Sequence, residues 1–263
     1  MIIVGLFQKV FVADTMAALV NGVFAKPTAD LQGIEILLAT YAFAFQIYGD
    51  FAGYSSIARG VARWLGFDLM VNFRRPYFAA SPSEFWQRWH ISLSQWLRDY
   101  LYIPLGGNRG GHWNTNRNLL LTMLLGGLWH GANWTFIAWG AFHGLLLVVY
   151  RQFESRAGAH RKNSEPIAGW DRFARQVLMF HLICFGWLLF RADSMTQVVE
   201  WISAFRSGLV ITPLAKMMLG MIVFCVSPLM VFELWEEHYS SGELLRRHWA
   251  LRAAVYATAV QLM

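Results

Sequence analysis

The chain has 263 residues, of which 56% are hydrophobic and only 14% are charged. Soluble domains carry about 25% charged residues, so this composition excludes an ordinary soluble domain and favours an integral membrane protein. The net charge of +6 does not indicate nucleic-acid binding, because the Lys and Arg residues lie in loops between apolar runs, where cytoplasmic positive charge is expected. Cys184 and Cys225 lie far apart in apolar runs, which offers neither a disulfide framework nor the spacing of a metal site.

The N-terminal part of the chain predicts one membrane span. Residues 1–12 are apolar but few, which indicates the end of a helix, and residues 14–30 predict a connector with a turn at Lys26-Pro27-Thr28. Residues 31–48 come close to the ~20 apolar residues that a crossing helix needs. We therefore expect the first complete crossing over residues 31–48.

An acid between glycines follows this span. Gly49-Asp50-Phe51-Ala52-Gly53 predicts a break in the helix, after which a helical pattern resumes over residues 55–65. We expect Asp50 to support the fold at a capped break. The alternative is an acid that lines a cavity.

Residues 59–117 form the longest polar interval, with eight Arg against three acids. Within it, Ser81-Pro82-Ser83-Glu84 has the pattern of a capping box with Pro at the first helical position. The helix that it opens would carry an apolar, mostly aromatic stripe, made of Phe85, Trp89, Leu93, Trp96 and Tyr100. Such a helix is expected to lie at or just inside the membrane interface.

Residues 118–150 contain no Lys, Arg, Asp or Glu, yet they include His130 and His143. A polar ring is costly in a bilayer and is usually kept for a function. An imidazole, whose ordinary pKa is near ~6.5, can also accept or donate a proton at neutral pH. The alternative for either ring is a hydrogen bond that ties two helices together.

The distribution of charge predicts the topology. Further spans are expected over residues 177–190 with their flanks, 214–232 and 249–263. The basic loops 59–117 and 151–175 should face the cytoplasm. Residues 118–150 must then cross the membrane twice, with only ~16 residues for each crossing.

Two short helices that meet near Gly126-Gly127 or near Asn133 would satisfy this topology. Irregular backbone at membrane depth is tolerated where it lines a polar cavity or is buried in protein, so we expect a cavity with His130 near it. The predicted fold is all-α: a polytopic transmembrane helix bundle with interfacial or re-entrant helices around a central cavity.

Five ordered motifs resemble those of the membrane-bound O-acyltransferases. They are residues 48–55 (YGDFAGYS), 72–77 (NFRRPY), 84–94 (EFWQRWHISLS), 98–108 (RDYLYIPLGGN) and 127–132 (GLWHGA). The similarity extends from residues 5–9 (GLFQK) through residues 190–192 (FRA). The branch that the chain resembles most is that of the alginate O-acetyltransferase membrane subunits. The D-alanyl-lipoteichoic acid acyltransferases are a more distantly related branch.

The resemblance implies an acyltransferase. The family's invariant histidine falls on His130 and a second, widely retained one on His90, which implies that both are catalytic. His130 would act as general base on an acceptor hydroxyl, or hold that hydroxyl for attack on a thioester. The implied activity is O-acetyl transfer from a cytoplasmic donor, acetyl-coenzyme A or another acyl thioester, toward an extracytoplasmic polysaccharide such as alginate.

The same resemblance implies a multi-pass protein of the cell inner membrane. Its partners would be the lipid bilayer, the thioester donor, and the polysaccharide or an extracytoplasmic acetyltransferase, with no bound cofactor, metal or nucleic acid. Family members have several helices before the segment that begins at Gly5, so residues 1–263 are expected to be the C-terminal portion of such an enzyme, in a single membrane domain. The alternatives are an inactive fragment or assembly subunit, and a histidine-based membrane transporter.

Some residues keep two interpretations. His143 lies 13 residues after His130, which is not a same-face interval on one helix, and we expect it to matter less. Arg74, Arg75 and Arg88 either hold the phosphates of a coenzyme A donor or serve only as positive-inside charges, which we favour slightly. The residues that bind the donor are therefore unassigned.

Overall fold

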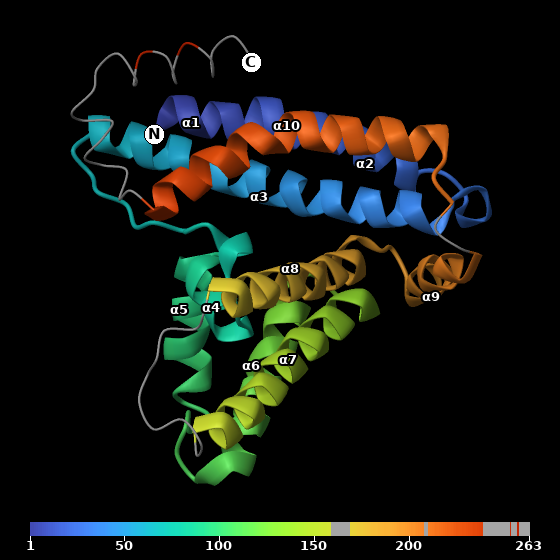
Figure 1. The fold of residues 1–263 in the computed structure, drawn as a ribbon. Helices are drawn as coiled ribbons and strands as arrows, with labels where there is room; N and C mark the ends of the chain where they lie inside the picture. Colours follow the sequence, from blue (N-terminus) through green and yellow to red (C-terminus); the bar gives the residue numbers. More distant parts are fainter. Residues whose placement is uncertain (159–168, 208–209, 239–252, 254–256, 258–263) are drawn as a thin grey trace. The chain divides into compact units, whose positions relative to one another are not determined.

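The computed structural model describes residues 1–158, 169–207, 210–238, 253 and 257, and all the regular elements among them are helices (Figure 1). Four of these helices are long and apolar enough to cross a membrane: Ile2–Phe24, Trp134–Glu154, Gly169–Arg191 and Pro213–Trp235. The predicted all-α, multi-pass membrane fold is confirmed. The span expected over residues 249–263 lies outside the described residues, apart from Ala253 and Ala257, which are helical.

The chain divides into two compact units, which are described separately. The first comprises Met1–Met70 and Val199–Met263, and the second comprises Val71–Val198. The second unit contains both histidines of the predicted catalytic pair.

The first unit begins with one continuous helix rather than a helix end and a connector. It is built from α1 (Ile2–Leu6), the π-helical η1 (Phe7–Asp14) and α2 (Thr15–Phe24). The connector predicted from residue 14 is therefore wrong as far as Phe24. Asp14 does not end the helix, because the wide π turn brings it to the Lys9 ammonium, 2.9 Å away. The turn at Lys26-Pro27-Thr28 is confirmed, with the short η2 (Thr28–Asp30) following it.

The helix α3 (Gly33–Trp64) runs without interruption through Gly49 and Gly53, so the predicted break is wrong. These glycines allow helices to approach closely. A Cβ at Gly49 would lie 2.8 Å from the Gln8 carbonyl oxygen, and one at Gly53 would lie 2.7 Å from the Gly5 carbonyl oxygen. The carboxylate of Asp50 does not cap a break but pairs with Lys9 at 2.6 Å.

The helix α10 (Pro213–His238) confirms the span predicted over 214–232 and packs along α3. The Tyr48 hydroxyl donates a hydrogen bond to the buried carboxylate of Glu233, and Thr212 donates one to Glu35 at 2.5 Å. The crossing expected over residues 31–48 lies within α3, which is not among the four helices that meet the length and hydropathy of a span.

The second unit consists of short helices beside three long ones. Its elements are η3 (Pro76–Phe78), α4 (Pro82–Arg88), α5 (Ile91–Leu97), the π-helical η4 (Arg98–Tyr102), α6 (Gly111–His130), α7 (Trp134–Gly158), α8 (Gly169–Arg191) and the start of α9 (Met195–Ala204). The span predicted over residues 177–190 is confirmed by α8.

The start of α4 follows the sequence prediction in part. The Ser81 hydroxyl accepts a hydrogen bond from the Glu84 amide at 3.1 Å, and Pro82 occupies the first turn. The Glu84 carboxylate accepts from the Ala80 amide at 2.7 Å, one residue before the cap. The N-cap is therefore confirmed, while the returning bond of the box goes to the preceding residue.

The single interfacial helix predicted after this cap is wrong, because the chain turns at His90. His90 has a left-handed backbone with φ of 42°, which ends α4 and starts α5. The proposed stripe is consequently divided: Phe85 and Trp89 are buried, whereas Trp96 and Tyr100 are 54% and 69% exposed.

The helices α6 and α7 form an antiparallel hairpin (Figure 1). Its turn lies at Gly131–Asn133, so the predicted break near Asn133 is confirmed and the alternative at Gly126-Gly127, inside α6, is wrong. The Asn133 side chain donates a hydrogen bond to the Asp193 carbonyl oxygen at 2.9 Å. The turn of the hairpin is thereby fixed beside the end of α8.

Exposed tryptophans lie at both ends of these long helices. Trp113 and Trp170 are 80% and 82% exposed near the starts of α6 and α8, and Trp129 and Trp134 are 66% and 73% exposed at the hairpin turn. Sixteen residues separate Trp113 from Trp129 along α6, which corresponds to ~24 Å at 1.5 Å per residue. This is close to the thickness of a bilayer core, whose borders favour tryptophan. Of the two crossings predicted over residues 118–150, however, only α7 is among the four helices that meet the length and hydropathy of a span.

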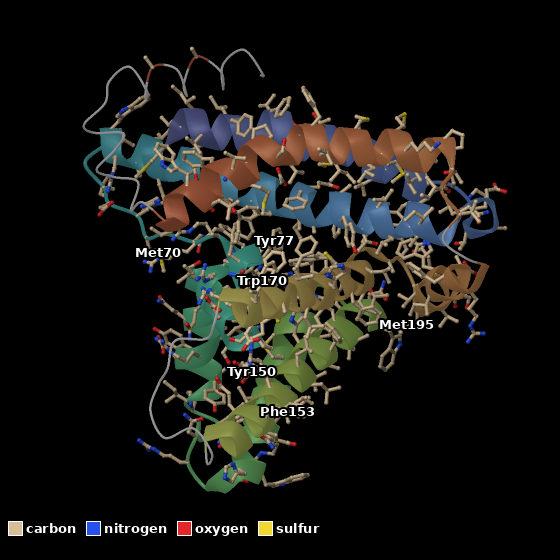
Figure 2. All side chains as sticks on the ribbon, in the orientation of Figure 1. Met70, Tyr77, Tyr150, Phe153, Trp170 and Met195 are labelled. Atoms are coloured by element: carbon tan, nitrogen blue, oxygen red, sulfur yellow. The ribbon has the colours of Figure 1, made fainter. Side chains whose placement is uncertain are left out.

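The tryptophans at the helix ends make the predicted topology testable at single residues. In that topology the segment around Arg109 faces the cytoplasm. Trp170 lies at the start of α8 and Met195 begins α9, four residues after α8 ends at Arg191 (Figure 2), so Met195 should face outward. In a background in which Cys184 and Cys225 are replaced by alanine, an impermeant maleimide should label Met195→Cys in intact cells. Arg109→Cys should be labelled only after permeabilisation, and its labelling in intact cells would contradict the topology.

Candidate active site

His130 is the last residue of α6 and its ring is half-buried. The imidazole lies edge-on to Trp139 and Phe190, with ring centroids at 5.3 and 5.1 Å. Gly131 follows directly, and a Cβ there would come within 2.7 Å of the Phe136 ring. The imidazole is thus held by aromatic rings while part of it remains accessible, as a group that must reach a substrate requires.

His90 lies at the bend between α4 and α5, where Asn72 holds the backbone. The Asn72 carbonyl oxygen accepts from the Ile91 amide at 2.9 Å. The Asn72 side-chain oxygen accepts from the Ser92 amide at 3.1 Å and hydroxyl at 2.7 Å. These bonds fix the start of α5 and with it the left-handed backbone of His90.

The two predicted histidines interact electrostatically. Burial lowers the pKa of His90 to about 4, and the positive charge of a protonated His130 acts in the same direction. His90 is therefore neutral at neutral pH, when its imidazole carries one N–H donor and one acceptor nitrogen.

His143 belongs to the same aromatic cluster. The sequence argument that its spacing separates it from His130 assumed one continuous helix, whereas the hairpin turn puts the two histidines on antiparallel helices. Trp139 contacts both imidazoles, at 5.3 Å for His130 and 4.8 Å for His143. The contact of Trp139 with His143 follows the i, i+4 interval on α7. Its contact with His130 had no signal in the sequence, since Trp139 is one of many aromatic residues in apolar runs.

The basic residues near α4 contribute mainly to the fold. Arg88 donates to the Glu84 carboxylate at 2.7 Å and to the Arg75 carbonyl oxygen at 3.3 Å. Arg172 of α8 reaches the same carboxylate at 3.3 Å. Arg88 is thus engaged within the protein, which favours a structural role over a phosphate contact.

Within the part of the chain that the structure describes, no group of three or more His, Cys, Asp or Glu side chains is placed to hold a metal ion. The chemical groups of the candidate site are the imidazoles of His130 and His90, each of which lies against aromatic rings. Together with the hairpin and the crossing helices, they define a polytopic α-helical membrane protein with a histidine-centred site.

Comparison with known proteins identifies the family. Residues 1–190 match the membrane-bound O-acyltransferase (MBOAT) family. The chain belongs to this family, as the five motifs predicted.

Several curated bacterial proteins are similar to the chain. It is 49% identical over 197 residues to the "Probable alginate O-acetylase AlgI" of Azotobacter vinelandii, covering 75% of this chain and 37% of the relative. It is 49% identical over 199 residues to the protein of the same name from Pseudomonas aeruginosa, covering 75% and 35%. It is 39% identical over 197 residues to the "Peptidoglycan O-acetyltransferase" of Helicobacter pylori, covering 75% and 36%. The chain thus spans little more than a third of the length of these relatives.

Proposed function

We propose that the protein containing this chain is a membrane O-acyltransferase that transfers an acetyl group to a polysaccharide. The observation that carries the proposal is the half-buried, partly accessible His130 at the turn of the α6–α7 hairpin in a member of the membrane-bound O-acyltransferase family. The names of the alginate and peptidoglycan acetylating relatives support a glycan hydroxyl as acceptor. The donor is acetyl-coenzyme A or another acyl thioester on the cytoplasmic side of the inner membrane.

In the proposed reaction His130 acts as general base. It takes the proton of the acceptor hydroxyl while the oxygen attacks the thioester carbonyl carbon. A new C–O bond forms and the C–S bond breaks, after which the imidazolium returns the proton to the leaving thiolate. The products are the ester and the free thiol, and a positioned base of this kind contributes ~10²–10⁴-fold to the rate.

His90 complements this base as a hydrogen-bond donor. A neutral imidazole can donate its N–H to the carbonyl oxygen, where negative charge develops during the attack. The pKa of about 4 keeps His90 in this neutral form at neutral pH. The two histidines would then have different roles, one accepting a proton and one stabilising charge.

The overall proposal is tested with a labelled donor. Membranes that contain the complete protein and its associated acetyltransferase should transfer the acetyl label of [¹⁴C]acetyl-coenzyme A to added alginate or to the polysaccharide of the source organism. Matched membranes without the protein should not do so. Labelling that is equal in both preparations would refute the acyltransferase assignment.

A further inference from the structure

Trp139 connects the candidate active site to a third imidazole, that of His143, which the proposed reaction does not use. Its indole lies 5.3 Å from the His130 ring at an interplanar angle of 85°, and 4.8 Å from the His143 ring at 59°. Trp139 itself is 3% exposed. We propose that His143 is a positioning residue for acyl transfer, which holds Trp139 against His130; this inference rests on the proposed function.

The surroundings of His143 explain why its ring is fixed. The imidazole is 1% exposed and lies against the rings of Trp86 and Phe85 of α4, at 5.2 and 6.1 Å. On α8, a Cβ at Gly186 would come within 2.7 Å of the His143 Nε2 atom. Side chains and backbone from α4, α7 and α8 therefore meet at this ring and leave it little room to turn.

The polarity of His143 adds a second argument. Its Nε2 atom has no hydrogen-bond partner among the described residues. An unpaired polar atom in a buried site costs free energy, which an apolar ring of similar size would avoid. Because this nitrogen bonds to none of the described residues, the ring acts on Trp139 through its shape, and an apolar ring of similar size should serve as well.

The contacts around the Trp139 indole determine how closely it is held against His130. The Trp139 indole is also packed by Trp86 and Phe190, with ring centroids at 5.8 and 5.6 Å. Loss of the His143 ring would open one face of the indole and let it withdraw from His130. Because a misplacement of ~1 Å can cost up to ~100-fold in rate, kcat should fall while KM for the acceptor changes little.

The experiment uses the complete protein in its membrane complex. His143→Ala should lower kcat about tenfold with an unchanged KM, whereas His143→Phe should retain most of the activity because it keeps a ring of similar shape. Gly186→Ala should also lower kcat, since its methyl group would press on the His143 ring. Gly169→Ala is the matched control on the same helix, because a Cβ at Gly169 meets nothing within 4 Å, and it should leave kcat unchanged.

A double-mutant comparison tests whether His143 acts through Trp139. Trp139→Leu should lower kcat, and adding His143→Ala to it should cause little further loss. Independent losses that multiply would overturn the proposal. So would a normal kcat in His143→Ala, or a loss in His143→Phe as large as in His143→Ala, which would indicate chemistry at the nitrogen atoms.

The chemical reactivity of His130 can be measured without catalysis, and it distinguishes the positioning role of His143 from the proposed function. The rate at which diethyl pyrocarbonate modifies His130, measured by mass spectrometry of the membrane protein, should change in His143→Ala but not in Gly169→Ala. An unchanged modification rate would contradict the positioning role. If His130→Ala is inactive while His143→Ala is normal, only the positioning role fails; if His130→Ala is fully active, the proposed mechanism fails as well.

Discussion

Replacing His130 with alanine should lower acetyl transfer at least ~100-fold, the loss expected when a general base is removed. The protein should still insert and fold, because His130 is the last residue of α6 and alanine is the best helix former. The substitution also makes a membrane segment more apolar, which favours insertion. His143→Ala should cost far less, since its ring acts on the site only through Trp139.

The measurement is the acetyl content of the polysaccharide from cells that express each variant at matched membrane abundance. His112→Ala is a suitable control, because it removes an exposed imidazole from the first turn of the same helix. Normal acetylation by His130→Ala would show that the catalytic assignment is wrong. A loss explained wholly by lower abundance would instead favour a structural hydrogen bond.

Replacing His90 with glycine should lower kcat by ~10²–10³, as removal of a donor to a developing oxyanion does. Glycine is the informative replacement here, because the backbone φ of 42° is left-handed and glycine adopts it without steric cost. Alanine would combine loss of the imidazole with backbone strain. His90→Asn should fall between His90→Gly and the unmodified protein, since Asn tolerates this backbone and carries an N–H donor.

Single-turnover rates of acetyl transfer would separate this effect from slow product release. Thermal unfolding of the purified complexes should be similar for His90→Gly and His90→Asn, so that a difference in rate reports the donor rather than the fold. Equal rates for the two variants would contradict a hydrogen-bond role for His90. Full activity in His90→Gly would show that the His90 imidazole has no role in acetyl transfer.

Some features of this protein follow from the sequence because their causes are local. The N-cap at Ser81 depends on a hydroxyl that accepts a hydrogen bond from the backbone amide three residues later. Pro82 is suited to the first turn of a helix and not to its interior. The charge on the loops that flank the apolar segment predicts a turn within it, although the sequence left Gly126-Gly127 and Asn133 open as its place. His130 and His90 were identified through family motifs. Such motifs indicate which residues take part in the chemistry but not where their side chains lie in space.

Other features depended on partners that are distant in the sequence. Gly49 and Gly53 resemble a helix break, yet they allow the carbonyl groups of Gln8 and Gly5 to approach α3. A glycine has the same local effect in both settings, so only the neighbouring backbone decides between them.

The sequence by itself determined the all-α membrane fold, the family, the ends of several helices and the two candidate histidines. The tertiary structure alone decided that α3 is continuous, that the chain turns at His90, and that Trp139 of α7 contacts His130 of α6. Hydrophobicity, capping and charge act over a few residues or along one helix, so they can be predicted from the order of the residues. Contacts between antiparallel helices join residues whose separation in the sequence has no fixed period, so they arise only when the chain has packed.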